Sequence, residues 1–402
     1  MKRGAWHQFG DRSQKLVLEQ LQGGAGVGVI ISPRDLSFEN AARYAPQYRE
    51  LGADILVDQQ FYIPDFNNEL LNSYPLNNHR QAISSLTKMS EADISDLASQ
   101  ISAVNETLQA TAVLAPAVIY ESGRRDIVEL NAKLFRAAKA AGDNLGLPTI
   151  ATILIGHSAT ASTQLAEQVL SYATALNSDG WYFGFEFQAD RVPAEVEPVS
   201  ICINSGLILA STGKPVLHAY AGPMSLLSFA FGATATGIGH NQNLWQFSRE
   251  RWLPAEQGGG GGGDAPARFF SNTLWGTIVY PDELIQLPRS LTGKIYTPSA
   301  FSQPSFAESP LPWGRWEANK HLVKIICNEI SQIASLQGAK ASAHYAISKL
   351  EAANNLYEQI RQRGVVLRDN SNAYHENWCT ALENLLAQSE QELEYLEMIG
   401  TL

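Results

Sequence analysis

Four side chains that can exchange protons stand where predicted strands of this chain end. Asp58 follows the apolar run 55–57, Glu186 ends another run, and His157 and His218 follow two more. Two separated carboxylates can divide the roles of nucleophile and acid or base. A histidine exchanges protons near neutral pH without a large pKa shift. We therefore predict that these four residues form one catalytic pocket, with Asp58 or Glu186 as nucleophile or base and His218 as proton carrier.

Structural roles for the same residues are the alternative. The two carboxylates could form ion pairs with Arg34 or Arg191, and a histidine at a strand end is often only hydrogen-bonded. His157, His218 and His240 suit zinc by residue type, but no H-E-x-x-H or other short ligand spacing accompanies them. We predict no metal site and no cofactor.

Further polar, aromatic and glycine residues follow the same strands and are predicted to bind substrate. Aromatic rings could stack a planar ligand, although packing in the core is an equally common use of them. The substrate is therefore predicted to be a small planar molecule. The predicted substrate-binding residues are Arg34, Gln60, Tyr62, Gln188, Tyr220, Gly239 and His240.

Alternating apolar runs and helical patterns predict the elements that must position these residues. In the central unit, residues 214–240, a short apolar run, a helical pattern from Pro223 and a second small-residue strand form a βαβ repeat. This alternation predicts an α/β fold, a (β/α)8 TIM-like barrel with a C-terminal helical extension, whose ligands gather at the C-terminal edge of the strands. A doubly wound open sheet is the competing arrangement. Seven strands are predicted at residues 27–31, 55–57, 111–115, 148–155, 181–187, 215–217 and 233–238, and residues 275–280 could supply the eighth.

The predicted domain organisation is one large domain and an appendage. A chain of 402 residues with 45% hydrophobic residues can bury a large core. We expect a barrel at 1–290, a linker at 291–313 and a C-terminal domain of three helices at 314–402. Six consecutive glycines at 258–263 cannot pack side chains, so they are predicted to form a mobile lid.

The net charge and the cysteine content restrict the binding partners and the cellular location that we expect. The net charge of -11 argues against a basic nucleic-acid binder, although a local basic mouth stays open. The three cysteines form no CxxC pair, which favours a reducing, cytoplasmic location. No apolar run reaches the roughly 18 residues of a membrane span, so no membrane partner is expected. A nucleic acid partner, a protein partner and a homodimer all stay open.

Two stretches of the chain carry a resemblance to a known family. Gly52-Ala53-Asp54 leads into a strand, residues 58–62 and a long loop, and residues 214–239 form the later βαβ unit. In the order of elements over residues 25–285, the chain resembles the tRNA-guanine transglycosylases and their relatives in 7-deazaguanine chemistry. These are barrels that exchange a nucleobase through an aspartate nucleophile. The resemblance implies a glycosyltransferase that transfers or binds a (deaza)guanine-like base.

The chain departs from that family at two places. The Cys-x-Cys-x-x-Cys zinc motif is absent, and residues 239–242 contain no carboxylate where the nucleophile is expected. These departures imply a divergent or non-catalytic base-binding role. Two other functions stay open, a barrel enzyme acting on a phosphorylated metabolite and a non-catalytic scaffold whose helical tail binds a protein partner.

Overall fold

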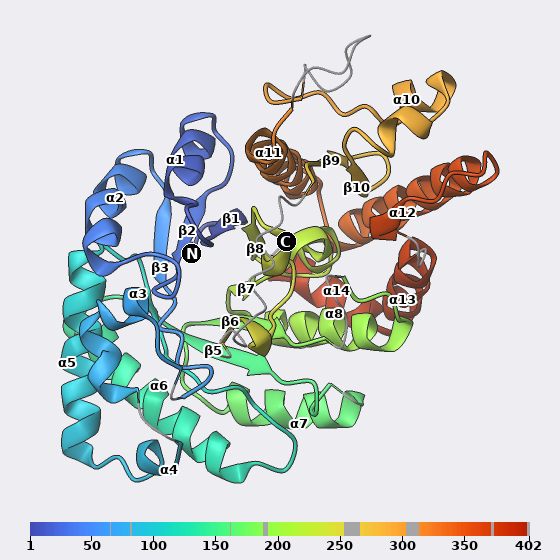
Figure 1. Cartoon of the computed structure of the whole chain (residues 1–402). Coiled ribbons are helices and arrows are strands. Elements are labelled where there is room, and N and C mark those ends of the chain that lie inside the picture. The colour runs from blue at the N-terminus through green and yellow to red at the C-terminus, as the bar shows by residue number, and fades with distance from the viewer. Residues whose placement is uncertain are drawn as a thin grey trace.

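Eight parallel strands form a nearly closed barrel in the computed structural model (Figure 1). The structure describes residues 1–64, 66–80, 83–160, 162–187, 192–252, 266–302, 313–370 and 374–399. Around the barrel the strands follow the order β3-β2-β1-β8-β7-β6-β5-β4. They are β1 (Gly4–Gln8), β2 (Gly28–Ile31), β3 (Asp54–Val57), β4 (Val113–Leu114), β5 (Thr149–Ile155), β6 (Gly180–Phe185), β7 (Val216–His218) and β8 (Ala235–Gly239). The predicted TIM-like barrel is therefore confirmed.

The two edge strands, β3 and β4, come together just before β4 begins. The Thr111 backbone N–H donates to the Ile55 carbonyl oxygen at 2.9 Å, and the Ile55 N–H donates to Thr111 Oγ1 at 3.1 Å. These two bonds join the edges at one point, so the barrel is nearly closed.

Alternate residues of each strand face the barrel interior and the surrounding helices, because side chains of a strand point to opposite faces. One buried cluster fills the interior, and it includes Trp6, Ile30, Leu56, Tyr182 and Leu217. Their strand neighbours belong to a second cluster between the strands and the helices. Among the members of this outer cluster are Val29, Ile31, Ile55, Val57, Trp181, Phe183 and Val216.

Helices follow most strands and cover the barrel from outside. The helix α5 begins at a capping box, in which Ser90 Oγ accepts from the Asp93 N–H and the Asp93 carboxylate accepts from the Ser90 N–H. The helices of the barrel region are α1 (Gln14–Gln22), α2 (Phe38–Glu50), α3 (Glu69–Asn72), α4 (Ile83–Leu86), α5 (Glu91–Thr107), α6 (Arg125–Leu145), α7 (Thr163–Thr174), α8 (Val196–Ala210) and α9 (Ser225–Ala230).

Sequence analysis missed the first strand and placed the eighth wrongly. β1 has no apolar run, because its inward residues are Trp6 and Gln8 and its outward His7 bonds to the Ala25 carbonyl oxygen. Residues 275–280 are not a barrel strand. β10 (Gly276–Val279) instead pairs antiparallel with β9 (Arg268–Ser271) in a separate two-stranded sheet.

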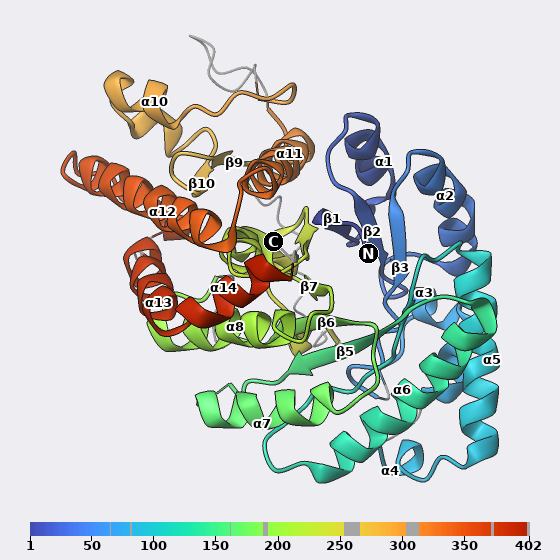
Figure 2. The ribbon, with the colours of Figure 1, turned by 180° about the vertical axis from the view of Figure 1, so that it is seen from behind.

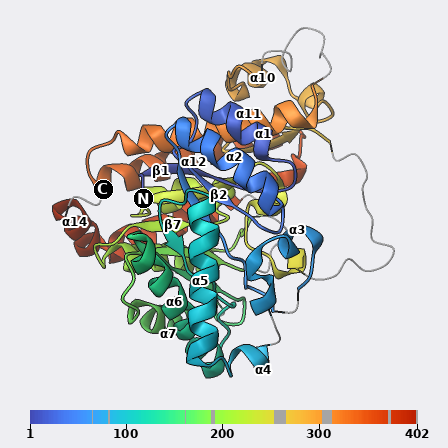
Figure 3. The same cartoon turned by 90° about the vertical axis from the view of Figure 1, so that its left-hand side faces the viewer.

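The C-terminal helices pack against the barrel on the side of β1, α8 and α9 (Figure 2). Figure 3 shows α10 and α11 toward the top of the molecule, with α4 at the bottom. The predicted third helix is two helices, because the chain breaks at Ser389. The division at residues 290 and 314 stays a prediction, and the six glycines lie outside the described residues. The C-terminal helices are α10 (Arg289–Ile295), α11 (Arg315–Ala334), α12 (Ala339–Arg361), α13 (Tyr374–Gln388) and α14 (Glu390–Met398).

Candidate functional site at the barrel mouth

Asp58 lies at the floor of the barrel mouth, directly after β3, and is 1% exposed. Three tyrosine hydroxyls donate to its carboxylate, Tyr62 at 2.5 Å, Tyr182 at 3.1 Å and Tyr220 at 3.3 Å. The Gln60 backbone N–H donates to Asp58 Oδ1 at 3.2 Å. Strand ends that are distant in sequence therefore meet on one carboxylate, as barrel geometry predicts.

Burial raises the pKa of Asp58 to about 6, although the hydrogen bonds from the tyrosines and Gln60 act in the opposite direction. Burial also raises the pKa of Tyr62 and Tyr182 well above the ordinary value, so their hydroxyls stay protonated and remain donors. Among the described residues, no cation lies within ion-pair distance of Asp58. Asp58 is therefore a group that can take up or release a proton near neutral pH.

Two residues beside Asp58 hold an uncommon backbone conformation. Gln60 has φ +54° and Tyr220 has φ +53°, in the left-handed region that residues other than glycine seldom adopt. Such conformations persist only where the surroundings enforce them, and they concentrate at functional sites. Both turns direct a predicted substrate-binding side chain toward the mouth.

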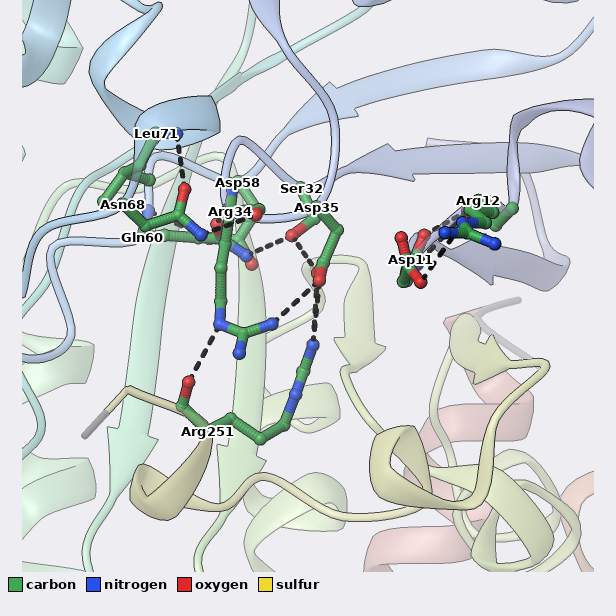
Figure 4. A network of polar contacts seen from close by, with 12 residues as sticks. Asp11, Arg12, Ser32, Arg34, Asp35, Asp58, Gln60, Asn68, Leu71 and Arg251 are labelled. Carbon is green, nitrogen blue, oxygen red and sulfur yellow. Dashed lines mark hydrogen bonds and ion pairs between the residues drawn. The ribbon is translucent and has the colours of Figure 1, made fainter. Parts of the chain in front are cut away.

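Gln60 contacts Asp58 through its backbone N–H, and its side chain joins a polar network directly after β2 (Figure 4). Its Oε1 accepts from the Arg34 N–H at 2.9 Å, and its Nε2 donates to Ser32 Oγ at 2.8 Å. Ser32 Oγ donates to Asp35 Oδ2 at 2.7 Å, and Arg34 Nη1 donates to Asp35 Oδ1 at 2.8 Å. The side chains of Gln60 and Arg34 are thus held in place before any ligand arrives.

A buried cationic side chain, Arg80, interacts electrostatically with Asp58. The Arg80 guanidinium lies over the Phe61 ring at 5.0 Å and donates from Nη2 to the Gln59 carbonyl oxygen. Burial lowers the pKa of Arg80 to about 9, and the Asp58 charge opposes this shift. Arg80 is therefore a cation at neutral pH and favours the ionised form of Asp58 electrostatically.

Residues 242–252, which we call the cap segment, cover the mouth above Asp58. The Phe247 ring lies 5.3 Å from Tyr62 and 5.6 Å from Tyr220, and Trp252 lies 5.4 Å from Tyr62, all measured between ring centroids. Both cap rings are buried and belong to the interior cluster of the barrel. The mouth is therefore closed by aromatic side chains in this structure.

Glu186 lies at the end of β6 in a different environment. Arg249 of the cap segment donates to it from Nε at 2.7 Å and also from Nη2, and His157 Nδ1 lies 3.2 Å away. Arg249 Nη2 is also paired with Glu121. Burial alone would raise the pKa of Glu186, but the hydrogen bonds from Arg249 and His157 outweigh it, so this pKa lies below its ordinary value. Glu186 forms an ion pair, as the structural alternative predicted, but with Arg249.

His218 does not reach the site, so the prediction of one pocket for all four residues is wrong. Leu217 faces the barrel interior, and side chains alternate, so His218 faces the helices. Its Nδ1 lies 2.5 Å from Ser228 Oγ, and its ring stacks on Phe183 at 4.6 Å. Burial lowers the pKa of His218 to about 3, which keeps the imidazole neutral. A role as proton carrier for Asp58 is not possible from this position.

The other predicted residues lie around the rim. His240 is buried at the end of β8 beside Trp316, and burial lowers its pKa to about 4. Gly239 lies against Leu244, where an added Cβ would collide with the leucine side chain. The His157 side chain is 42% exposed. Gln188 lies outside the described residues.

Sequence analysis missed several residues of the site. Tyr182 was hidden in an apolar run, where a tyrosine at an inward position was the available signal. Arg249, Phe247 and Trp252 belong to a polar and aromatic stretch after the last barrel strand, residues 246–252, to which no role was assigned. The position of Arg80 in the long loop after β3 carried no signal, because its neighbours are set by tertiary packing.

Comparisons with known proteins give no further identification. No protein-family model matches the chain, and no curated protein matches it. Within the described ranges, no group of three or more His, Cys, Asp and Glu side chains is arranged to hold a metal ion. The helices of the described part also include none long and apolar enough to span a membrane.

Proposed function

We propose that this protein binds a small planar base with hydrogen-bonding edges at the barrel mouth, and that Asp58 exchanges a proton with it. The observation that carries the proposal is the environment of Asp58, a buried carboxylate with a pKa near 6 under three neutral tyrosine hydroxyls. A carboxylate so placed can accept a ligand N–H in its ionised form and return a proton in its neutral form.

The surrounding side chains support a flat ligand. Tyr62 and Tyr220 supply rings beside Asp58, and aromatic faces stack on planar groups. Gln60 and Arg34 supply polar groups that the Ser32–Asp35 network already orients. Preorganised groups bind with less loss of side-chain entropy. The resemblance to tRNA-guanine transglycosylases makes a (deaza)guanine-like base our preferred ligand and base transfer the reaction it implies.

Calorimetric titration of the purified protein with guanine and with 7-deazaguanine tests this function. We expect the natural chain to bind one of them and Asp58→Asn to lose that binding. Asp143→Asn is the matched control, because its carboxylate lies on the surface in an ion pair with Lys139. Failure of both bases to bind, or equal binding by Asp58→Asn, would contradict the proposal. Ribose 5-phosphate in the same experiment tests the phosphorylated-metabolite alternative.

A partner-binding role of the C-terminal helices is the second candidate, and an exposed apolar stripe favours it. Tyr395, Met398 and Ile399 are 41%, 76% and 37% exposed at the end of α14. Exposed apolar groups at this spacing share one face of a helix. Sedimentation velocity of the natural chain and of Met398→Glu measures self-association through this stripe. Identical monomer profiles for both would remove the case for a second copy as the partner.

A further inference from the structure

The side chains that close the barrel mouth also separate Asp58 from solvent. Asp58, Tyr62 and Trp252 are each 1% exposed, and Tyr220 is 2% exposed. A planar base cannot touch the carboxylate while these side chains keep their places. Some part of the wall must therefore move.

The cap segment divides into an anchored half and a half held by ion pairs and by two aromatic rings. Leu244 packs so closely on Gly10 and Gly239 that neither glycine has room for a Cβ, and Trp245 packs on Gly222 in the same way. This half is fixed by close packing. In residues 247–252, the side chains of Arg249 and Arg251 reach carboxylates, and the Arg251 carbonyl oxygen accepts from Arg34 Nε at 2.9 Å.

Two arginines hold this second half at opposite sides of the mouth. Arg249 reaches Glu186, directly after β6, and Glu121, in the segment between β4 and α6, and its backbone N–H also donates to Glu186 at 3.1 Å. Arg251 reaches Asp35 after β2, with Nη2 donating at 3.1 Å. Phe247 and Trp252 lie on either side of Arg249 in sequence and fill the space above Asp58. Opening this half requires the ion pairs to break and both rings to leave the interior cluster, so removal of the ion pairs should lower the free-energy cost of opening.

The closed half also contains buried polar atoms that the described residues leave unpaired. These are Arg251 Nε and Trp252 Nε1, and the anchored half contains one as well, Trp245 Nε1. Each is a donor that has lost water without gaining an acceptor, which destabilises the closed arrangement. Opening would return the Arg251 and Trp252 donors to solvent.

We propose that residues 247–252 are a displaceable plug, anchored by Leu244 and Trp245 and latched by Arg249, whose aromatic rings occupy the ligand position above Asp58. The part of this proposal that concerns the ligand rests on the proposed function. The movement of the plug does not depend on it. Arg249 is the latch because, of the two arginines, it contacts two carboxylates and Arg251 contacts one.

Hydrogen–deuterium exchange with mass spectrometry measures the plug directly. Arg249→Gln removes the ion pairs with Glu186 and Glu121, so we expect backbone exchange in residues 247–252 to rise about tenfold. Exchange in β6 should stay unchanged. Arg136→Gln is the matched control, because it breaks an ion pair with Glu91 between α5 and α6, away from the mouth. Unchanged exchange of the plug in Arg249→Gln would overturn the proposal, and so would an equal rise in β6, which reports global loosening.

Glu121→Gln provides a second variant if Arg249→Gln does not fold. It removes one of the two carboxylates and should raise plug exchange about threefold. Stopped-flow binding of guanine then separates the two proposals. If plug exchange is faster in the variants but guanine binds to none of the proteins, the plug proposal is supported and the base-binding function is contradicted. Guanine binding at the same association rate in Arg249→Gln and the natural chain would keep the function and overturn the plug.

Discussion

Asp58 and Glu186 are both carboxylates at the end of a barrel strand, and both are almost fully buried, yet their surroundings differ. Asp58 is contacted by neutral tyrosine hydroxyls and a backbone N–H, while Glu186 is contacted by the Arg249 guanidinium. Burial raises the pKa of Asp58 to about 6, whereas the hydrogen bonds from Arg249 bring the pKa of Glu186 below its ordinary value against the effect of burial.

The comparison shows what decides the role of a buried carboxylate. A guanidinium compensates the lost hydration of Glu186, so that group stays ionised and holds the cap segment. Hydroxyl donors compensate Asp58 only in part, so that group can change its protonation state near neutral pH. The position after a strand is common to both, and the donor set makes one a candidate for chemistry and the other a structural contact.

The largest expected difference between the two residues is in ligand binding. Asp58→Asn removes the charge that faces the proposed base, and we expect its affinity for guanine or 7-deazaguanine to fall about 100-fold. Glu186→Gln should change that affinity far less. Calorimetric titration of both variants checks this. An equal loss of base affinity in the two variants would contradict the different roles of Asp58 and Glu186.

The next effect is on stability, where we expect Glu186→Gln to be more harmful than Asp58→Asn. Glu186→Gln leaves Arg249 with Glu121 alone, and we expect a loss of about 2 kcal/mol at pH 7.5, reduced from the buried-pair range because Arg249 is partly exposed. Since the folded pKa of Glu186 is lowered, its stabilising contribution is present above the unfolded value and is lost as pH falls below about 4.5. Urea unfolding at pH 7.5 and pH 4 measures the change, which should shrink at the lower pH.

Asp58→Asn should instead stabilise the fold at pH 7.5, by about 1.5 kcal/mol. The folded pKa of Asp58 is raised to about 6, so its favourable contribution is full below about pH 4 and is lost as pH rises through 6. Asparagine removes the cost of burying the charge but accepts the tyrosine hydroxyls less well. The gain should disappear in urea unfolding at pH 4. A loss of stability at pH 7.5 would show that the charge of Asp58 is fully compensated.

The smallest effect is expected at His218, which faces away from both carboxylates. His218→Leu leaves Ser228 Oγ without its imidazole partner, and we expect a loss of about 1 kcal/mol. Base affinity should stay within about twofold, since the ring lies in the helical layer. The same titration and unfolding experiments measure both quantities. A large loss of base affinity with normal stability would show that His218 takes part in ligand binding.

The sequence by itself determined the barrel and the approximate ends of most of its strands. Short apolar runs alternate with helical patterns, and polar residues follow the runs, so Asp58, Gln60, Tyr62 and Tyr220 could be placed at the mouth in advance. These are local signals of periodicity and turn chemistry. They failed for β1, where an inward glutamine and an outward histidine interrupt the apolar pattern.

Only the tertiary structure decided which side chains meet. The direction of His218 depends on a one-residue alternation that a strand end predicted from sequence cannot fix. The partner of Glu186 comes from Arg249, 63 residues later, and the donors around Asp58 come from as far away as Tyr220, 162 residues later. Contacts of this separation are set by how the sheet closes and how the cap segment packs, and no local pattern encodes them.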